Sequence, residues 1–259
     1  MVVKITRHRL LAAIAVLLAL VLLLYLCAPY LPFGTQVTAR GSRAERTVAL
    51  TFDDGPNATY TPQVLQILDQ YNAVATFFVI GANVERHPEI ARSIVEHGHQ
   101  IANHSESHSN DLPYWTPDQV MKDYRSAQKA IRDATGFTPR FYRAPHGKVS
   151  PWMRWALRRQ GVVMVRWNCS VRDWTNPGVD KLTSRVLNKT HSGSIILLHD
   201  GYDLKEDPDR YQLVQALPTI IGKLQAEGYT FVTVAQLLNQ EPYSTDTTDT
   251  SAQGKSLPQ

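Results

Sequence analysis

Residues 48–56 read VALTFDDGP and combine a short apolar run with a polar turn. The run from Val48 to Phe52 is rich in apolar and β-branched side chains, and its length fits a buried strand. Two acidic residues, Asp53 and Asp54, follow at once, and the Gly-Pro pair behind them predicts a turn. The segment therefore predicts a buried strand that carries two carboxylates at one end of a sheet.

The alternation of strand and helix signals continues from this segment to about residue 240. Further short apolar runs predict strands at 76–80, 141–142, 162–167, 195–198 and 231–234. Helical periodicity with start and stop signals predicts helices at 61–71, 88–97, 116–135, 151–161, 180–190 and 213–226. Such alternation indicates a parallel sheet with helices outside it. We therefore predict the α/β class, as one distorted (β/α) barrel of about seven parallel strands over residues 47–240.

An apolar run of 19 residues, 10–28, precedes this domain and is interrupted only by the amphipathic Tyr25. As a helix it spans about 28 Å, close to the ~30 Å hydrocarbon core of a bilayer. Residues 1–9 carry three bases, and the positive-inside rule places them in the cytoplasm and the rest of the chain outside. We predict a single-pass transmembrane signal anchor in the cell membrane. The alternative is a secreted protein, released by cleavage near the small residues at 37–39.

Charge and composition narrow the possible partners. The 259 residues carry a formal net charge of +4, but the N-terminal flank holds three of the bases, so the remainder is nearly neutral. The sequence shows no dense basic block with interleaved aromatic residues, so no nucleic-acid partner is expected. Cys27 lies near the end of the apolar run and Cys169 lies deep in the body, so no disulfide between them is expected. Residues 29–46 are interpreted as a linker, and the polar residues 241–259 as a disordered tail.

Several polar residues stand just after predicted strands, where barrels of this kind carry their chemistry. Asp53 and Asp54, taken alone, fit solvated turn residues. His104 and His108 would face the same way on one helical turn, which suits two ligands of one metal ion; without Asp54, a surface pair would be an equal alternative. Two histidines with a carboxylate form a common catalytic zinc set and also resemble the triad of non-haem iron. His199 could donate a proton near neutral pH, with a core or loop histidine as the alternative.

Together these residues resemble the polysaccharide deacetylases with a NodB homology domain, the fourth carbohydrate esterase family, over about residues 46–240. Five separated motifs occur in the family's order and spacing. The first, T-F-D-D-G-P, is matched in full by residues 51–56. The resemblance implies that Asp53 is the general base and that Asp54 is a metal ligand.

The second and third motifs extend this set. H-[ST]-x-x-H is matched by His104 to His108, and the resemblance implies that both histidines are metal ligands. The third motif, R-x-P followed by an aromatic residue and glycine, appears as RAPHG from Arg143, which the resemblance pairs with the base Asp53. His146 occupies the aromatic position, a departure from the pattern. Its backbone N–H would still supply the implied contact to the oxyanion.

The last two motifs imply the acid and the acetyl pocket. The fourth ends in Asp173-Trp174; the resemblance implies that Asp173 orients the acid histidine and that Trp174 lines the acetyl pocket. An acidic residue often seen three positions before this aspartate is Ser170 here. The fifth motif, L-x-H, is matched by Leu197 and His199, which implies an apolar pocket wall and the general acid.

The resemblance implies a metal-dependent hydrolase that removes N-acetyl groups from peptidoglycan or a chitin-like glycan outside the cytoplasm. Its cofactor would be a divalent ion, zinc by default, with cobalt or another ion as the alternative. An O-acetyl esterase of acetyl-xylan and a catalytically silent glycan-binding module are the alternative functions. The expected partners are the acetylated polysaccharide and the membrane, while the sequence leaves the oligomeric state open. Trp115, Trp152 and Trp155 are interpreted as helix-packing residues, with a sugar groove as the alternative.

Overall fold

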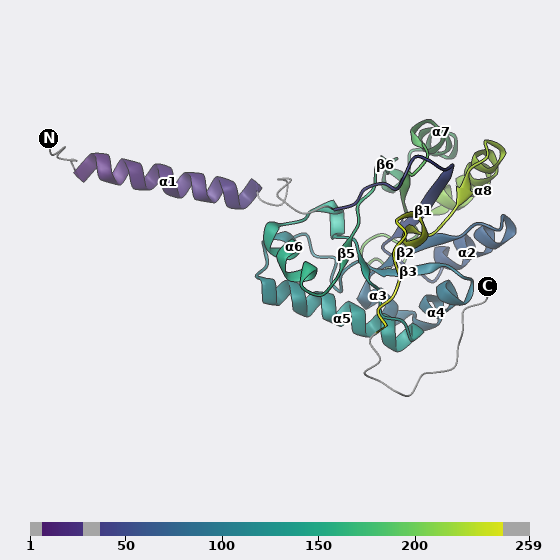
Figure 1. Cartoon of the computed structure of the whole chain (residues 1–259), viewed down its shortest axis with the longest axis horizontal. Coiled ribbons are helices and arrows are strands. Elements are labelled where there is room, and N and C mark those ends of the chain that lie inside the picture. Colours follow the sequence, from purple (N-terminus) through teal and green to yellow (C-terminus); the bar gives the residue numbers. More distant parts are fainter. Residues whose placement is uncertain (1–6, 28–36, 246–259) are drawn as a thin grey trace.

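The computed structural model describes residues 7–27 and 37–245. In this part of the chain, eight parallel strands form one sheet in the order β5-β4-β3-β2-β1-β7-β6, and β8 pairs with the start of β1 (Figure 1). The strands are β1 Thr47–Asp53, β2 Ala75–Val79, β3 Gln100–Asn103, β4 Phe141–Tyr142, β5 Val163–Met164, β6 Cys169–Ser170, β7 Ile195–His199 and β8 Thr230–Phe231. Among the described residues, β5 and β6 do not pair with each other, so the barrel is open on one side. The predicted α/β barrel is confirmed, with eight strands where about seven were expected.

Helices lie outside the sheet, apart from the short α9, which contributes to the barrel interior, and they follow local start and stop signals. In α5, Thr116 and Gln119 form a reciprocal capping box at the start, and Gly136 ends the helix in the left-handed conformation. The predicted strand at 231–234 is shorter than expected, because Thr233 caps a short helix instead. The helices of the body are α2 Tyr60–Gln70, α3 Gly81–Arg86, α4 Pro88–Glu96, α5 Pro117–Thr135, α6 Pro151–Arg158, α7 Val179–Lys189, α8 Tyr211–Ala226 and α9 Val234–Leu237. Short 3-10 turns occur at Leu112–Tyr114, Pro145–Gly147 and Asp173–Thr175.

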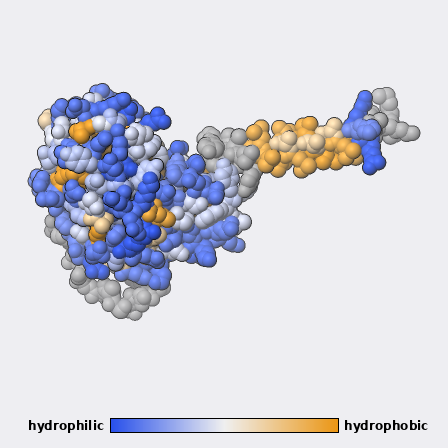
Figure 2. All heavy atoms as spheres, turned by 180° about the vertical axis from the view of Figure 1, so that it is seen from behind, coloured by the Kyte–Doolittle hydropathy of each residue, from blue (hydrophilic) through white to orange (hydrophobic). Residues whose placement is uncertain are grey.

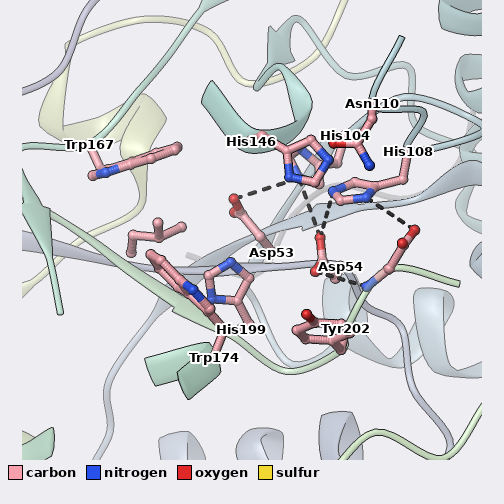
Figure 3. A pocket seen from close by; sticks show the side chains of 12 residues that line it. Asp53, Asp54, His104, His108, Asn110, His146, Trp167, Trp174, His199 and Tyr202 are labelled. Atoms are coloured by element: carbon pink, nitrogen blue, oxygen red, sulfur yellow. Dashed lines mark hydrogen bonds and ion pairs between the residues drawn. The ribbon is translucent and has the colours of Figure 1, made fainter. Parts of the chain in front are cut away.

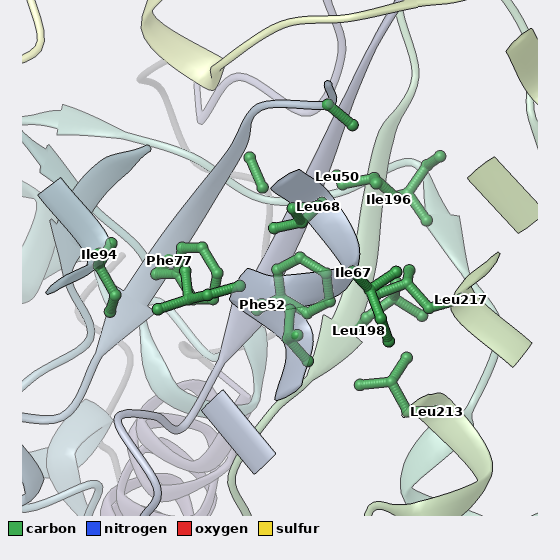
Figure 4. Packing of buried hydrophobic residues seen from close by; sticks show 14 of the residues in the cluster. Leu50, Phe52, Ile67, Leu68, Phe77, Ile94, Ile196, Leu198, Leu213 and Leu217 are labelled. Atoms are coloured by element: carbon green, nitrogen blue, oxygen red, sulfur yellow. The ribbon is translucent and has the colours of Figure 1, made fainter. Parts of the chain in front are cut away.

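The outer face of the sheet packs against these helices. Leu50 and Phe52 of β1 belong to a large apolar cluster with residues of α2, α4, α7 and α8 (Figure 4). The rings of Phe52 and Phe77 stack with their centroids 5.0 Å apart. Every residue of β1 after Thr47 is buried, which explains why four of the five residues from Val48 to Phe52 are apolar, without alternation of apolar and polar side chains.

The inner face of β1 positions the site. Ala49 belongs to a second cluster that fills the barrel interior, together with Phe78, Ile195 and two residues of α9. Thr51, two positions further along, donates a hydrogen bond from Oγ1 to the carbonyl of the neighbouring β7 at 2.7 Å. Side chains alternate along a strand, so Asp53 is the next to face inward, at the C-terminal end of the strand.

Residues before β1 also contact the sheet. Thr38 exchanges backbone hydrogen bonds with Met164 and Arg166 at 3.1 and 2.8 Å, and Gly41 donates to Gly193 at 2.8 Å. The last part of the segment predicted as a linker therefore lies across the side between β5 and β7.

The start of the predicted disordered tail is also packed. Tyr243 stacks on Phe137 with ring centroids 4.5 Å apart, and its hydroxyl accepts a hydrogen bond from the backbone of Ile101 at 3.3 Å. Residues 246–259 lie outside the described part of the chain.

The N-terminal helix α1 spans Arg7–Cys27. Within the described residues it is the one helix long and apolar enough to cross a membrane, and its window Arg7–Leu24 is entirely unburied. Figure 2 shows an apolar surface along α1 and a hydrophilic one at its N-terminal end. Length and composition fit either a membrane anchor or a signal sequence. Residues 1–6 and residue 28 of the predicted flank and anchor lie outside the described residues.

The burial of three tryptophans and one cysteine can be compared with the roles expected from the sequence. Trp115 is half-buried against an apolar cluster, in agreement with the packing interpretation. Trp152 and Trp155 are 50% and 57% exposed, so the packing interpretation is wrong for both. The inner face of α6 is already filled by smaller residues of the same cluster. Cys169 is a buried free thiol.

Candidate active site

A cavity of about 360 Å³ opens at the C-terminal ends of the strands (Figure 3). Its walls include eight of the ten predicted site residues: Asp53, Asp54, His104, His108, His146, Trp174, Leu197 and His199. The other two, Arg143 and Asp173, contact Asp53 and His199 from behind. The β1–β7 register places Asp53 directly beside His199, which explains why residues far apart in the sequence meet here.

Arg143 holds Asp53 in place. The guanidinium is fully buried, and its Nη1 donates hydrogen bonds to Asp53 Oδ1 at 2.5 Å and to Thr51 Oγ1 at 2.8 Å. It also stacks over the ring of Phe78, 3.9 Å from the centroid. Burial lowers the pKa of Arg143, and the Asp53 carboxylate opposes that shift. One carboxylate oxygen of Asp53 is therefore held by the buried ion pair with Arg143. The other oxygen is available for catalysis in the cavity.

Asp54 reaches the same cavity because its backbone leaves the strand conformation. Its φ of +73° is left-handed, a region that aspartate tolerates better than most residues. Two glycines permit this turn. A Cβ on Gly55 would lie 2.4 Å from Asp200 Oδ2, and one on Gly201 would lie 2.3 Å from the Asp54 carbonyl oxygen. Consecutive acids that would point apart in a regular strand are therefore both directed at the site.

Asp54, His104 and His108 form a buried cluster whose possible ligand atoms all lie within 4.8 Å of one another. Asp54 Oδ1 lies 3.4 Å from His104 Nε2 and 3.1 Å from His108 Nε2. His104 Nδ1 donates to the carbonyl oxygen of Arg143 at 2.8 Å, so Nε2 of a neutral ring carries its lone pair toward the cluster. Asp54 Oδ1 is buried without a hydrogen-bond partner. Two imidazole nitrogens and an unpartnered carboxylate oxygen fit a divalent metal ion.

The electrostatics of the cluster favour an ionised ligand. Burial raises the pKa of Asp54, but the imidazoles of His104 and His108 and the charge of His199 outweigh it, and the pKa lies well below its ordinary value. Burial also lowers the pKa of His108, while Asp54 and Asp203 raise it, with a net upward shift.

The segment from His104 to His108 is a loop, so the expectation of one helical turn is wrong. Ser105 and His108 both have left-handed backbone conformations, with φ of +72° and +50°. The Asp123 carboxylate of α5 accepts hydrogen bonds from two successive backbone N–H groups of the loop at 2.9 and 3.1 Å. A contact with a distant helix therefore sets the loop, and the two imidazoles still meet, with ring centroids 5.1 Å apart.

His199 is held by Asp173 through two hydrogen bonds. Its Nδ1 donates to Asp173 Oδ1 at 3.0 Å, and its backbone N–H donates to Oδ2 at 2.8 Å. The ring meets Trp174 edge-on, with centroids 5.3 Å apart. Burial lowers the pKa of His199, but Asp173 and the more distant carboxylates outweigh it and raise the pKa to about 9. The imidazole is therefore protonated at neutral pH, and Nε2 is the nitrogen left to donate.

The remaining predicted residues shape the cavity wall. His146 has a left-handed backbone with φ of +56°, and its ring lies edge-on to His108, with centroids 4.7 Å apart. Leu197 and Trp174 give the wall apolar surface. Ser170, where the family often has an acid, pairs with Leu197 in the β6–β7 register and does not line the cavity.

Sequence reasoning missed Asp203, which contacts two members of the cluster. Its backbone N–H donates to Asp54 Oδ2 at 3.0 Å, and its Oδ1 accepts from His108 Nδ1 at 3.2 Å. It lies in the loop after β7, four residues beyond His199, among several other acids. The acid-rich loop next to a motif histidine was the available signal, but the sequence does not mark which acid turns inward. Trp167, Asn110 and Tyr202 complete the lining.

Known proteins share this fold and sequence. A family model described as polysaccharide deacetylase matches residues 40–165. The chain is 38% identical over 199 residues to a peptidoglycan-N-acetylglucosamine deacetylase of Bacillus cereus, covering 75% of this chain and 89% of that protein. It is 41% identical over 199 residues to the chitooligosaccharide deacetylase of a Bradyrhizobium species, covering 74% and 90%. The solved structure of the Bc1960 peptidoglycan N-acetylglucosamine deacetylase superposes with a TM-score of 0.74 at 33% identity, covering 80% and 95%.

Fold and site together define a (β/α)-barrel hydrolase with a His/His/Asp cluster at the mouth of the barrel. The chain belongs to the polysaccharide deacetylase family.

Proposed function

We propose that this chain is a metal-dependent N-deacetylase of peptidoglycan, acting on N-acetylglucosamine outside the cytoplasm. One observation carries the proposal: a carboxylate held from behind by a buried guanidinium, a potential metal-ligand set and a carboxylate-held imidazolium all face one cavity. The relatives named as peptidoglycan and chitooligosaccharide deacetylases support an N-acetylated glycan as the substrate class. A tethered domain outside the cytoplasm favours the cell-wall polymer among such glycans.

Asp54, His104 and His108 would hold the metal ion, with zinc the default for this donor set. When bound, a divalent ion lowers the pKa of water and polarises the acetyl carbonyl.

Other residues of the site would act as the base, the oxyanion donor and the acid of the hydrolysis. Asp53, positioned by Arg143, takes a proton from the attacking water as its oxygen bonds to the acetyl carbon. The backbone N–H of His146 donates to the carbonyl oxygen as charge develops there. Nε2–H of His199 gives its proton to the amide nitrogen as the C–N bond breaks, so acetate and a free amine leave. Asp173 sets the tautomer and orientation of that imidazole, as in carboxylate-oriented triads.

The apolar wall suits the acetyl group. Leu197 and Trp174 offer carbon surface beside the two catalytic side chains, where the methyl group of an acetyl would be removed from water. Localisation is part of the proposal: α1 would act as a single-pass anchor with the barrel outside, and cleavage would instead give a secreted enzyme.

The test is acetate release from peptidoglycan, chitin oligomers and acetyl-xylan, with the protein stripped of metal and reloaded with defined ions. We expect release from peptidoglycan, dependence on added metal, and loss of both release and metal binding in Asp54→Asn and His104→Ala. Asp207→Asn, which changes an exposed acid of the loop that also carries Asp203, is the matched control and should behave as the unmodified protein. Full activity without metal would overturn the mechanism, and release from acetyl-xylan alone would select the esterase. Glycan binding without release under any metal would select the silent module.

A further inference from the structure

The basic residues of the body are not evenly distributed. Residues 134–172 contain eight Lys or Arg and no Asp or Glu, although the chain as a whole is nearly balanced outside its N-terminal flank. Two of these basic side chains are buried: Arg143, in the site, and Arg154. Others lie on or next to α6 and β5, and they give this side of the barrel a positive surface.

The outer face of α6 combines tryptophan with arginine; we define it as Trp152, Trp155, Arg158 and Arg159. All four side chains are exposed, and the Arg159 guanidinium lies over the Trp155 ring, 5.1 Å from its centroid. The opposite face of the helix is buried in an apolar cluster. The exposed tryptophans are therefore surplus to the packing of the helix, because its core-facing positions are already filled.

The chain enters the barrel beside this helix. Val37 packs against the same apolar cluster that buries the inner face of α6, and Thr38 hydrogen-bonds to Arg166 next to β5. Figure 1 shows α6 and β5 at one end of the body. Nine residues separate α1 from Val37. Even fully extended, that length reaches only about 30–35 Å, so an anchored barrel stays within reach of the bilayer.

We propose that the outer face of α6 docks on the surface of an anionic phospholipid bilayer and orients the barrel on the membrane. Tryptophan is enriched at the membrane–water interface, where its ring lies at the level of the headgroups. Arginine binds phosphate through its planar fork, and each base near an anionic surface adds attraction. Neither tryptophan lines the active-site cavity, which favours lipid over a sugar subsite continuous with it. This docking rests on the proposed anchoring of α1.

The experiment uses the full chain reconstituted in vesicles of phosphatidylglycerol and phosphatidylcholine, with and without brominated acyl chains. Brominated lipid should quench the tryptophan emission of the unmodified protein. Most of that quenching should disappear in Trp152→Phe/Trp155→Phe and persist in the control Trp115→Phe. Reversal of charge in Arg158→Glu/Arg159→Glu should also reduce it, whereas the matched control K181E/K223E, on α7 and α8, should not. The midpoint of urea unfolding should be unchanged in all variants, which shows that they fold whatever their substrate.

The outcomes separate the docking from the anchor. Failure of the unmodified chain to float with the vesicles overturns the anchor and the docking with it. Flotation with equal quenching in the unmodified protein and in the Trp152→Phe/Trp155→Phe variant overturns the docking alone. A change in emission with chitin oligomers or peptidoglycan fragments that depends on these two tryptophans, without quenching by lipid, would assign the face to glycan instead.

Discussion

Replacement of Asp203 by Asn should weaken metal binding without touching a ligand. The Asp203 carboxylate accepts from His108 Nδ1 at 3.2 Å, and so fixes the nitrogen that faces the metal cluster. Asn is the informative change because φ at this position is +54°, where Ala would add backbone strain and Asn does not. The backbone N–H that supports Asp54 remains in the variant, so the change isolates the carboxylate.

The expected size follows from the geometry. Loss of a carboxylate behind a metal-bound histidine costs about 10–100-fold in affinity. The Asp203 side chain is 47% exposed, so water screens its charge, and Asn retains a neutral acceptor. We therefore expect a loss of metal affinity at the low end of this range, about 10-fold, which corresponds to about 1.4 kcal/mol.

The assay is competition for zinc between the protein and a chromogenic chelator, with the Kd compared across variants. Asp207→Asn supplies the matched control on the same loop, and urea unfolding of the metal-free proteins checks that stability is unchanged. A Kd in Asp203→Asn equal to that of the unmodified protein would refute the role of Asp203 in positioning His108. Equal losses in both variants would point to the charge of the loop rather than to this contact.

Three further changes test the buried parts of the site. Arg143→Met should destabilise the protein by about 3–5 kcal/mol in urea unfolding, because it leaves the buried Asp53 carboxylate unpaired. Adding Asp53→Asn should restore part of that loss, and strict additivity would contradict the pairing. Asp173→Asn should lower the pKa of His199 from about 9, so the alkaline limb of the pH profile of acetate release moves to lower pH; an unmoved limb would exclude His199 as the acid. Gly55→Ala should cost about 1–3 kcal/mol and weaken metal binding, because its Cβ would meet a buried carboxylate at 2.4 Å, and an unchanged unfolding midpoint would show that the turn can relax.

The predictable parts of this molecule are those in which local sequence controls the structure. The strand at 48–52 was recognisable because all its residues are buried. The helix at 116–135 was recognisable because its cap and its terminal glycine stand in the sequence. The predicted site residues converge because parallel strands end at the same edge of the sheet, so residues that follow strands are collected there.

The unpredicted parts depend on contacts between distant residues. The loop from His104 to His108 takes its shape from the Asp123 carboxylate on α5, which no local pattern reveals. Asp203 is one of several acids in its loop, and the turn of the chain that directs it toward the cluster is not visible in the sequence. The exposure of Trp152 and Trp155 follows from smaller residues that fill the cluster beneath α6, a property of the packed molecule rather than of the helix sequence.

The central position of β1 in the sheet affects the order in which the enzyme folds. Strand β1 pairs with the next strand, β2, on one side, but its other neighbours, β7 and β8, come from the last quarter of the barrel sequence, so the first strand to be made is completed last. Strand pairs that are far apart in the sequence form slowly, because the entropy of closing the long intervening loop is lost before the contacts between the strands stabilise the pair. Asp53 and His199 therefore meet only when the body is almost complete. A C-terminally interrupted chain would lack the reaction centre altogether rather than carry a weakened form of it.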